Sequence, residues 1–245
     1  MTENYEDFIS TVSHELRTPL TSIRGFAQTM LNSWDKLDDE SKKKFLKIIE
    51  DQSNRLINMV ENILSVSKLN TGNEKIILRD VSVKSVVTTV VQLIKLQYHD
   101  KNYILKINEK APDILADKDK FQQIMMNLIE NASKYSGQNN DITIESGFCP
   151  DNNFVSIKVI NYGIGIDEKD YNTIFTKFSR IDNPLTRTTQ GSGLGLFITK
   201  SLVEKMNGKI FVNSEKMDAE KSKITFEIEL PILDIEKQAR VKCVQ

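Results

Sequence analysis

Two long amphipathic helices account for the hydrophobic pattern at the start of the chain. Between residues 5 and 70 the apolar positions recur at alternating steps of three and four, the spacing of an a/d seam on an α-helix. The first seam comprises Ile9, Val12, Leu16, Pro19, Ile23, Phe26 and Met30, and the second Phe45, Ile49, Gln52, Leu56, Met59, Ile63 and Val66. The intervening stretch NSWDKLDDE supplies a turn and acidic residues suited to a helix N-terminus. The pattern therefore predicts an antiparallel helical hairpin, residues 1–71.

The two seams carry more apolar surface than a single hairpin covers. A second copy of the hairpin buries this surface by closing a four-helix bundle, which predicts a homodimer. The alternative is a hairpin that packs on the rest of its own chain.

Short β-rich runs mixed with helices follow Gly72. Strands are predicted at 75–81, 103–108, 141–146, 154–160, 209–214 and 223–230, and helices at 82–98, 117–133, 167–175 and 193–207. Because the order of strands and helices is mixed, we expect an α/β sandwich, a mixed sheet with helices on one face. The predicted organisation is thus α + α/β: the hairpin, a second domain at 72–233, and a charged tail at 234–245.

Charge and composition narrow the partners and the location of this fragment. Thirty-three basic residues nearly balance thirty-four acidic ones, so we expect no nucleic-acid binding. No apolar stretch approaches the roughly 20 residues that span a bilayer, and MTENYEDF lacks a signal-peptide pattern. We expect a cytoplasmic fragment without membrane contact, and an anchor upstream in a longer protein stays open. The spacing of Cys149 and Cys243 indicates neither a metal site nor a disulfide scaffold, so both are interpreted as reduced thiols.

The stretch SHELRTPL places a histidine opposite the seam of the first helix. With Ile9 at a and Val12 at d, His14 falls at f, where a side chain faces water. Pro19 has no N–H for the carbonyl of Glu15, so the helix should bend there at a cost of about 3 kcal/mol. The alternative is that His14 is an exposed polar residue of a coiled-coil surface without a functional role.

Amides, a lysine and glycine clusters indicate a phosphate-binding pocket in the second domain. Asn127, Asn131 and Lys134 are spaced four and then three residues apart, which puts them on one face of a predicted helix. Amide oxygens suit Mg²⁺, and a lysine suits phosphate. The clusters NYGIGI at 161–166 and GSGLGL at 191–196 follow, and the second leads into a helix whose N–H groups can meet phosphate oxygens.

The string FISTVSHELRTPLTSI resembles the phosphoacceptor box of the bacterial sensor histidine kinases. The resemblance implies that His14 accepts the γ-phosphoryl group of ATP, on Nε2. It further implies that Glu15 accepts a hydrogen bond from the other ring N–H, and that Thr18 orients water when the protein dephosphorylates its partner. The implied partner is the receiver domain of a response regulator, which takes the phosphoryl group on an aspartate.

The second domain resembles the ATP-binding domain that histidine kinases share with DNA gyrase, Hsp90-type chaperones and mismatch-repair ATPases. NLIENASKYS, NYGIGI, IFTKF and GSGLGL resemble its N, G1, F and G2 boxes, and the two resemblances together run from residue 8 to about 231. The resemblance implies that Asn131, with Asn127, holds Mg²⁺, and that 176–192 is a mobile ATP lid. The implied nucleotide contacts are Lys134, Tyr135, Asn161, Gly163, Gly165, Ile166, Lys177, Arg180, Gly191, Gly193, Leu194, Gly195 and Leu196, with Arg187 as a weaker candidate.

Two positions depart from related patterns. Gyrase- and chaperone-type ATPases carry a water-activating glutamate where this chain has Asn127, so slow water attack is expected. The G1 box normally begins with an aspartate that binds the adenine amino group, and here the residue is Asn161. The main interpretation is an ATP-dependent protein histidine kinase that also acts as a phosphatase of its regulator. A catalytically weakened scaffold or phosphatase and a stand-alone ATPase are the alternatives.

Overall fold

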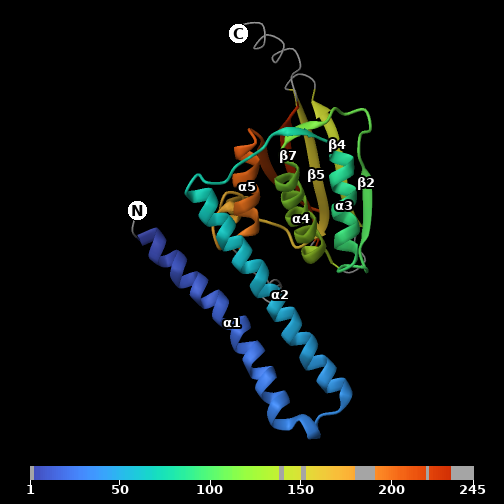
Figure 1. The fold of residues 1–245 in the computed structure, drawn as a ribbon. Helices are drawn as coiled ribbons and strands as arrows, with labels where there is room; N and C mark the ends of the chain where they lie inside the picture. Colours follow the sequence, from blue (N-terminus) through green and yellow to red (C-terminus); the bar gives the residue numbers. More distant parts are fainter. Residues whose placement is uncertain (1–2, 138–140, 150–152, 180–190, 219–220, 233–245) are drawn as a thin grey trace. The chain divides into compact units, whose positions relative to one another are not determined.

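A computed structural model of the chain describes residues 3–137, 141–149, 153–179, 191–218 and 221–232. Figure 1 shows the fold in ribbon form. The chain divides into two compact units, Met1–Asn73 and Glu74–Gln245, and each is described by itself.

The first unit is an antiparallel helical hairpin, as predicted. Helix α1 (Glu3–Ser33) and helix α2 (Asp39–Asn70) flank a short 3₁₀ turn at Trp34–Lys36. Asp38 caps α2 by accepting a hydrogen bond from the N–H of Ser41 at 2.6 Å, and this bond lowers the pKa of its carboxyl. The rings of Phe26 and Phe45 pack 5.2 Å apart near the turn. The helix α1 continues through Pro19, which is buried, as one uninterrupted α-helix.

Aliphatic side chains remain exposed along the hairpin. Seven of them are between 44% and 81% exposed: Ile9, Leu20, Leu31, Leu46, Ile57, Val60 and Leu64. Four of the seven lie on α2, and the last three of these, Ile57, Val60 and Leu64, follow helical steps of three and four. The hairpin therefore presents an apolar stripe beyond the seam that joins its own two helices.

The second unit is a five-stranded mixed sheet with helices on one face, which confirms the predicted fold class. The strand order is β2 (Asn102–Lys106), β4 (Asp141–Cys149), β5 (Phe154–Gly163), β7 (Ser222–Pro231) and β6 (Lys209–Lys216). The strands β2 and β4 pair in parallel, and the other pairs are antiparallel. The helices α3 (Val83–Lys95), α4 (Lys118–Tyr135) and α5 (Gly195–Lys205) cover one face (Figure 1).

The core of this unit lies between the sheet and its helices. Alternate residues of β5 (Val155, Ile157 and Val159) are fully buried, and α4 contributes Phe121, Ile124 and Leu128 to the same core. Burying an apolar side chain of this size stabilises the fold by roughly 1.5–3 kcal/mol. The core therefore holds β5 and α4, which carry six of the candidate nucleotide and metal contacts, against each other.

Three sequence-based expectations differ from the structure. The predicted helix at 167–175 is wrong: two short 3₁₀ turns, Glu168–Asp170 and Thr173–Phe175, stand there, because only the adjacent pair Ile174 and Phe175 is buried and no helical apolar stripe forms. The predicted strand at 75–81 is reduced to β1 (Arg79–Val81). Its antiparallel partner β3 (Ile114–Ala116) was not predicted, since three residues carry too little periodicity.

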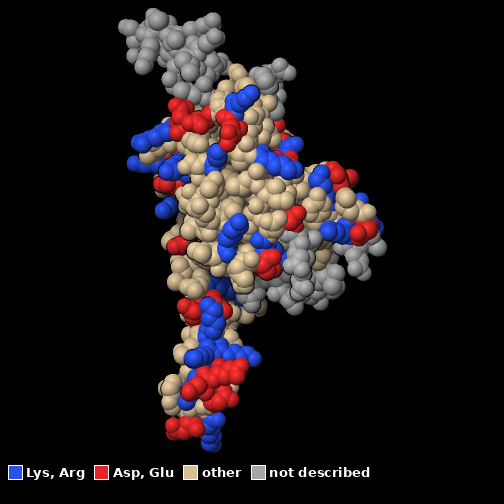
Figure 2. All heavy atoms as spheres, turned by 90° about the vertical axis from the view of Figure 1, so that its right-hand side faces the viewer, with Lys and Arg blue, Asp and Glu red and all other residues tan. Residues whose placement is uncertain are grey.

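The surface in Figure 2 carries acidic and basic side chains of both signs side by side, with no broad area of one sign on the face shown. Among the helices of the described residues, none has the length and apolar character required to cross a bilayer.

Candidate functional site

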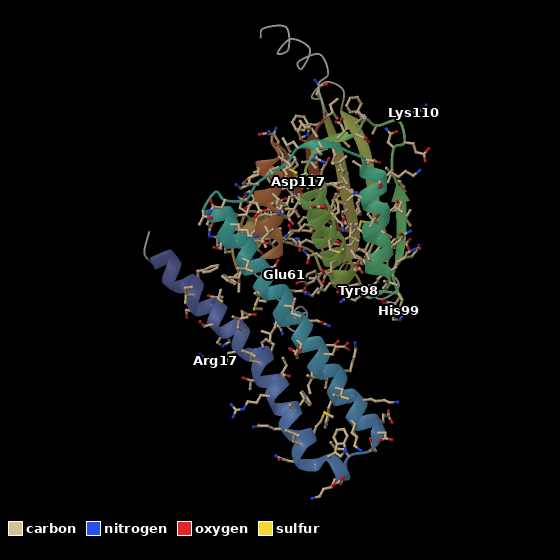
Figure 3. The ribbon with its side chains drawn as sticks, in the orientation of Figure 1. Arg17, Glu61, Tyr98, His99, Lys110 and Asp117 are labelled. Carbon is tan, nitrogen blue, oxygen red and sulfur yellow. The ribbon has the colours of Figure 1, made fainter. Side chains whose placement is uncertain are left out.

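His14 lies exposed on α1, where the heptad position predicts it. Ser13, Arg17 and Thr18 are exposed beside it. Arg17, one turn further along, lies on the side of α1 that faces away from α2 (Figure 3). The hydroxyl of Thr18 donates to the backbone carbonyl of His14 at 3.4 Å. The imidazole is therefore open to solvent on a helix face of small and polar side chains.

Glu15 links α1 to α2. A carboxylate oxygen of Glu15 lies 3.7 Å from a guanidinium nitrogen of Arg55, and both side chains are largely buried, at 25% and 20% exposed. The pair fixes the carboxylate one residue after His14. Glu15 was expected to accept a hydrogen bond from the imidazole, and that role stays a prediction.

The face of α4 formed by Asn127, Asn131 and Lys134 is half-buried. The Nδ2 atom of Asn127 donates to the hydroxyl of Thr199 at 2.7 Å, and its Oδ1 atom lies against the backbone of Gly195, where a methyl group would not fit. Asn127 thus joins α4 to the start of α5. Thr199 was missed from sequence, although it stands one turn after Gly195 on the same helix.

The C-terminal turn of α4 is anchored by buried polar groups. The hydroxyls of Tyr103 and Ser133 are 2.8 Å apart, and Lys101 donates to the carbonyls of Ser136 and Gly137 at 3.4 and 2.8 Å. A cation at the end of a helix also meets the negative end of the helix dipole. These contacts hold the turn that carries the candidate residues 134 and 135.

Asn161 ends the buried face of β5. It lies two residues after Val159 and therefore points to the same side of the sheet. Its cross-strand neighbour Ile224 is in turn paired with Ser214, so one row on this face reads Asn161, Ile224, Ser214. Asn161 is only 3% exposed. Asn161 thus places a buried amide at the end of the apolar row that β5 contributes to the core.

The glycine turn at 163–166 is held from three sides. Gly163 forms a β-bridge with Ser136 and touches the carbonyl of Tyr135 so closely that a Cβ atom would overlap it. The N–H of Ile166 donates to the hydroxyl of Ser214 at 3.0 Å, and Gly165 lies against Ser222 and Ser214. The turn from β5 is thereby fixed beside the end of α4.

Tyr171 and Ser214 support this turn and were not found from sequence. The phenol of Tyr171 accepts a hydrogen bond from the N–H of Ser214 at 2.7 Å, and the hydroxyl of Ser214 holds the N–H of Ile166. In both contacts a side-chain oxygen accepts from a backbone N–H, and Tyr171 and Ser214 lie 43 residues apart in the chain. No local pattern signals such a contact.

The second glycine cluster leads into α5. Gly191 lies beside the ammonium of Lys134: a Cβ atom added to Gly191 would lie 3.1 Å from the ammonium nitrogen. Gly193 has a φ of 66°, Leu194 is fully buried, and α5 begins at Gly195 with Leu196 half-buried. The first turn of α5 thus presents backbone N–H groups beside Asn127, and Gly191 before it lies beside Lys134.

The remaining candidates divide between described and undescribed residues. Tyr135 is 38% exposed, with the Lys134 ammonium 5.6 Å from its ring centroid. The ammonium of Lys177 lies 5.1 Å from the ring centroid of Phe197 on α5. Arg180, Arg187 and most of the predicted lid lie outside the described residues.

The donor set of this site suits Mg²⁺ held together with phosphate. In the part of the chain that the structure describes, no group of three or more His, Cys, Asp or Glu side chains is arranged to hold a metal. The site instead offers the amide oxygens of Asn131 and Asn127, with an ammonium and helix N–H groups for the phosphate. Mg²⁺ commonly binds through one or two protein oxygens and completes its shell with substrate phosphates and water.

Two family models match the chain. Residues 5–72 match the "His Kinase A (phospho-acceptor) domain", and residues 116–233 match the "Histidine kinase-, DNA gyrase B-, and HSP90-like ATPase". The first match contains His14, and the second contains all the candidate nucleotide contacts. The chain belongs to the sensor histidine kinase family.

Individual histidine kinases show the same relation. The chain is 32% identical over 209 residues to the sensor protein kinase WalK of Staphylococcus aureus. The matched region covers 85% of this chain and 50% of that protein. The chain therefore spans half the length of this curated relative. The histidine kinase ThkA, solved in complex with the response regulator protein TrrA, has a TM-score of 0.70 and 27% identity and covers 93% of this chain and 61% of that one.

A third similarity concerns the fold alone. The histidine kinase AdeS of Acinetobacter baumannii has a TM-score of 0.67 at 23% identity and covers 90% of this chain and 98% of that one. The hairpin and the mixed-sheet unit therefore occur together in other histidine kinases.

Proposed function

We propose that the chain is the core of an ATP-dependent protein histidine kinase and that His14 is its phosphoacceptor. The observation that carries the proposal is the combination, in one chain, of an exposed imidazole and a cluster of candidate nucleotide contacts without a general base at position 127. The Nδ2 atom of Asn127 donates to Thr199, and a carboxamide cannot take a proton from water. Bound ATP is therefore preserved for transfer to a side chain.

The transfer is a direct displacement at phosphorus. The lone pair on Nε2 of His14 attacks the γ-phosphorus, a nitrogen–phosphorus bond forms, and the bond from that phosphorus to the β–γ bridging oxygen breaks to release ADP. The ring keeps its proton on Nδ1 and becomes cationic, and the carboxylate of Glu15 offsets that charge. Asn131 and Asn127 would hold Mg²⁺, which neutralises phosphate charge. Lys134 and the first turn of α5 bind the phosphates.

The partners proposed from this chemistry are a second copy of the chain and a response regulator. The seven exposed aliphatic residues of the hairpin (9, 20, 31, 46, 57, 60 and 64) support a dimeric four-helix bundle. A monomeric mass by sedimentation equilibrium at micromolar concentration would count against it. The complex of ThkA with a response regulator supports an aspartate of such a receiver as the final acceptor.

Thr18 is the proposed phosphatase residue. It is exposed one turn after His14, where its hydroxyl can orient water toward a phosphoaspartate docked on α1. Thr18→Ala is expected to slow dephosphorylation of the regulator by about 100-fold while the labelling of His14 stays within about twofold. The measurement uses a panel of receiver domains, and takes the one that accepts label fastest. Equal losses in both reactions would show that Thr18 serves the fold of α1 instead.

Asn161 weakens the binding of adenine in this proposal. A neutral amide oxygen accepts a hydrogen bond from the adenine amino group without the charge assistance of a carboxylate, which costs about 1 kcal/mol. Asn161→Asp should therefore tighten ATP binding by about fivefold to tenfold, measured by calorimetry with a non-hydrolysable ATP analogue. An unchanged affinity would remove position 161 from the base contact.

Asn161 also gives the competing proposal its support. An amide can turn and donate a hydrogen bond to guanine O6, whereas a carboxylate cannot. GTP should therefore compete better with ATP for the unaltered chain than for the Asn161→Asp variant. If the unaltered chain binds neither nucleotide at millimolar concentration, the weakened scaffold replaces the kinase as the better description.

A further inference from the structure

The chain is held on both sides of the junction between the two units. On the side of the hairpin, α2 ends in a Schellman motif: the N–H of Asn73 donates to the carbonyl of Lys68 at 3.1 Å, and the N–H of Gly72 to that of Leu69 at 3.4 Å. Gly72 adopts the left-handed conformation that this motif requires, with a φ of 71°. The helix cap therefore uses every residue up to Asn73, the last residue of the first unit.

On the side of the second unit, the first residue, Glu74, is held by an ion pair. The carboxylate of Glu74 forms an ion pair with the ammonium of Lys120 in the first turn of α4, and the two side chains are only 8% and 25% exposed. Three residues later, the N–H of Ile77 donates to Oδ2 of Asp117 at 2.9 Å. Figure 3 labels Asp117, which also caps α4 through the N–H groups of Asp119 and Lys120. We name residues 74–78, held by these two contacts, the strap.

The strap is attached to the helix that carries the pocket. Asn127, Asn131 and Lys134 lie further along α4, and residue 79 begins β1. Releasing the strap would leave the sheet and the pocket intact and free five residues, 74–78, between the cap of α2 and β1. Five extended residues reach about 17 Å.

We propose that the Glu74–Lys120 pair is a positioning device that sets the tether length between the pocket and His14. The inference rests on the proposed transfer from ATP to His14, and it concerns the rate of that transfer. A flexible tether spreads the nucleotide-binding unit over a larger volume and lowers its effective concentration at His14. Neither residue of the pair belongs to the pocket, so nucleotide affinity does not depend on it.

The first test removes the ion pair in the full chain. In Glu74→Gln and in Lys120→Gln, the rate at which [γ-³²P]ATP labels the chain at saturating ATP and Mg²⁺ should fall by about fivefold. The dissociation constant of a non-hydrolysable ATP analogue should stay within about twofold, and the N–H of Ile77 should exchange with deuterium faster. The double variant Glu74→Lys with Lys120→Glu restores the pair with reversed charges and should recover the rate.

A second variant separates tether length from the local stability of α4. Insertion of Gly-Ser-Gly-Ser between Asn73 and Glu74 keeps the ion pair and lengthens the tether, so it should slow labelling to the same extent as Glu74→Gln. Lys106→Gln is the matched control, because it removes an ion pair with Glu145 at 2.9 Å elsewhere in the same unit. Its rate should equal that of the unaltered chain.

The outcomes distinguish this inference from the proposed function. If the unaltered chain takes no label, the kinase proposal fails and the strap inference fails with it. If the unaltered chain takes label but the insertion and the single variants label as fast or faster, the kinase proposal stands and the strap inference is overturned. A raised dissociation constant that accounts for the whole loss in rate would equally overturn it.

Discussion

His14→Gln is expected to abolish the incorporation of phosphate from [γ-³²P]ATP into the chain, with at least about a thousandfold loss in rate. The glutamine amide keeps the length and polarity of the side chain but has no lone pair on nitrogen that can attack phosphorus. The residue is exposed on α1, so the substitution leaves no buried group unsatisfied and the hairpin should fold normally. The label on the unaltered chain should be lost in acid and survive in alkali, as expected of a phosphorus–nitrogen bond.

His99 provides a matched control for this variant. It is the only other histidine in the sequence, it is also exposed, and it lies beyond the end of α3 in the second unit (Figure 3). His99→Gln should label at the rate of the unaltered chain, and both variants should bind the ATP analogue equally well. Label that persists in His14→Gln would place the acceptor elsewhere.

Asn131→Ala is expected to slow labelling by about 100-fold. The proposed site offers few metal ligands, and removing a preorganised group that stabilises charge in the transition state typically costs between 100-fold and 1000-fold. Asn131 is half-buried beside Lys134 on the face of α4, so its loss leaves the core untouched. Raising the Mg²⁺ concentration should recover part of the rate, because the defect is in metal binding.

Gln122→Ala is the control for the helix itself. Gln122 precedes Asn131 by nine residues, which places it half a turn round α4 on the opposite side. Both changes put an alanine into the same helix, so a difference in labelling between the two variants cannot come from helix propensity. Equal rates in the two variants would exclude Asn131 from the metal site.

The long-period features of the fold were predictable from the sequence. The seam positions, which include Phe26 and Phe45, recur over many helical turns, so the sequence predicted the hairpin. The contact between the rings of Phe26 and Phe45 is consistent with that prediction. The strands of the main sheet have alternating apolar residues, such as Val155, Ile157 and Val159. The short elements could not be predicted, because they carry too few residues for a periodic pattern. The strand β3 has three residues, and the 3₁₀ turn Thr173–Phe175 buries only Ile174 and Phe175.

The site divides in the same way. His14, Asn131 and the glycine clusters were proposed from the sequence because their chemistry is local in it. The residues that support them were not, because they act across long sequence separations: Thr199 holds Asn127 from 72 residues away, and Ser214 holds Ile166 from 48. The strap belongs to this second class, since the short run from Glu74 to Leu78 has no motif of its own.

The measurement that tests the central claim most directly is the fate of the γ-phosphoryl group in a single turnover. The unaltered chain, in excess over [γ-³²P]ATP with Mg²⁺, is quenched in alkali at early times, and the label on protein and the inorganic phosphate are counted against the ADP formed. We expect label on the peptide that contains His14 to account for nearly all of the ADP. Inorganic phosphate in step with ADP, on a chain that carries no label, would contradict the assignment of His14 as acceptor and favour a stand-alone ATPase.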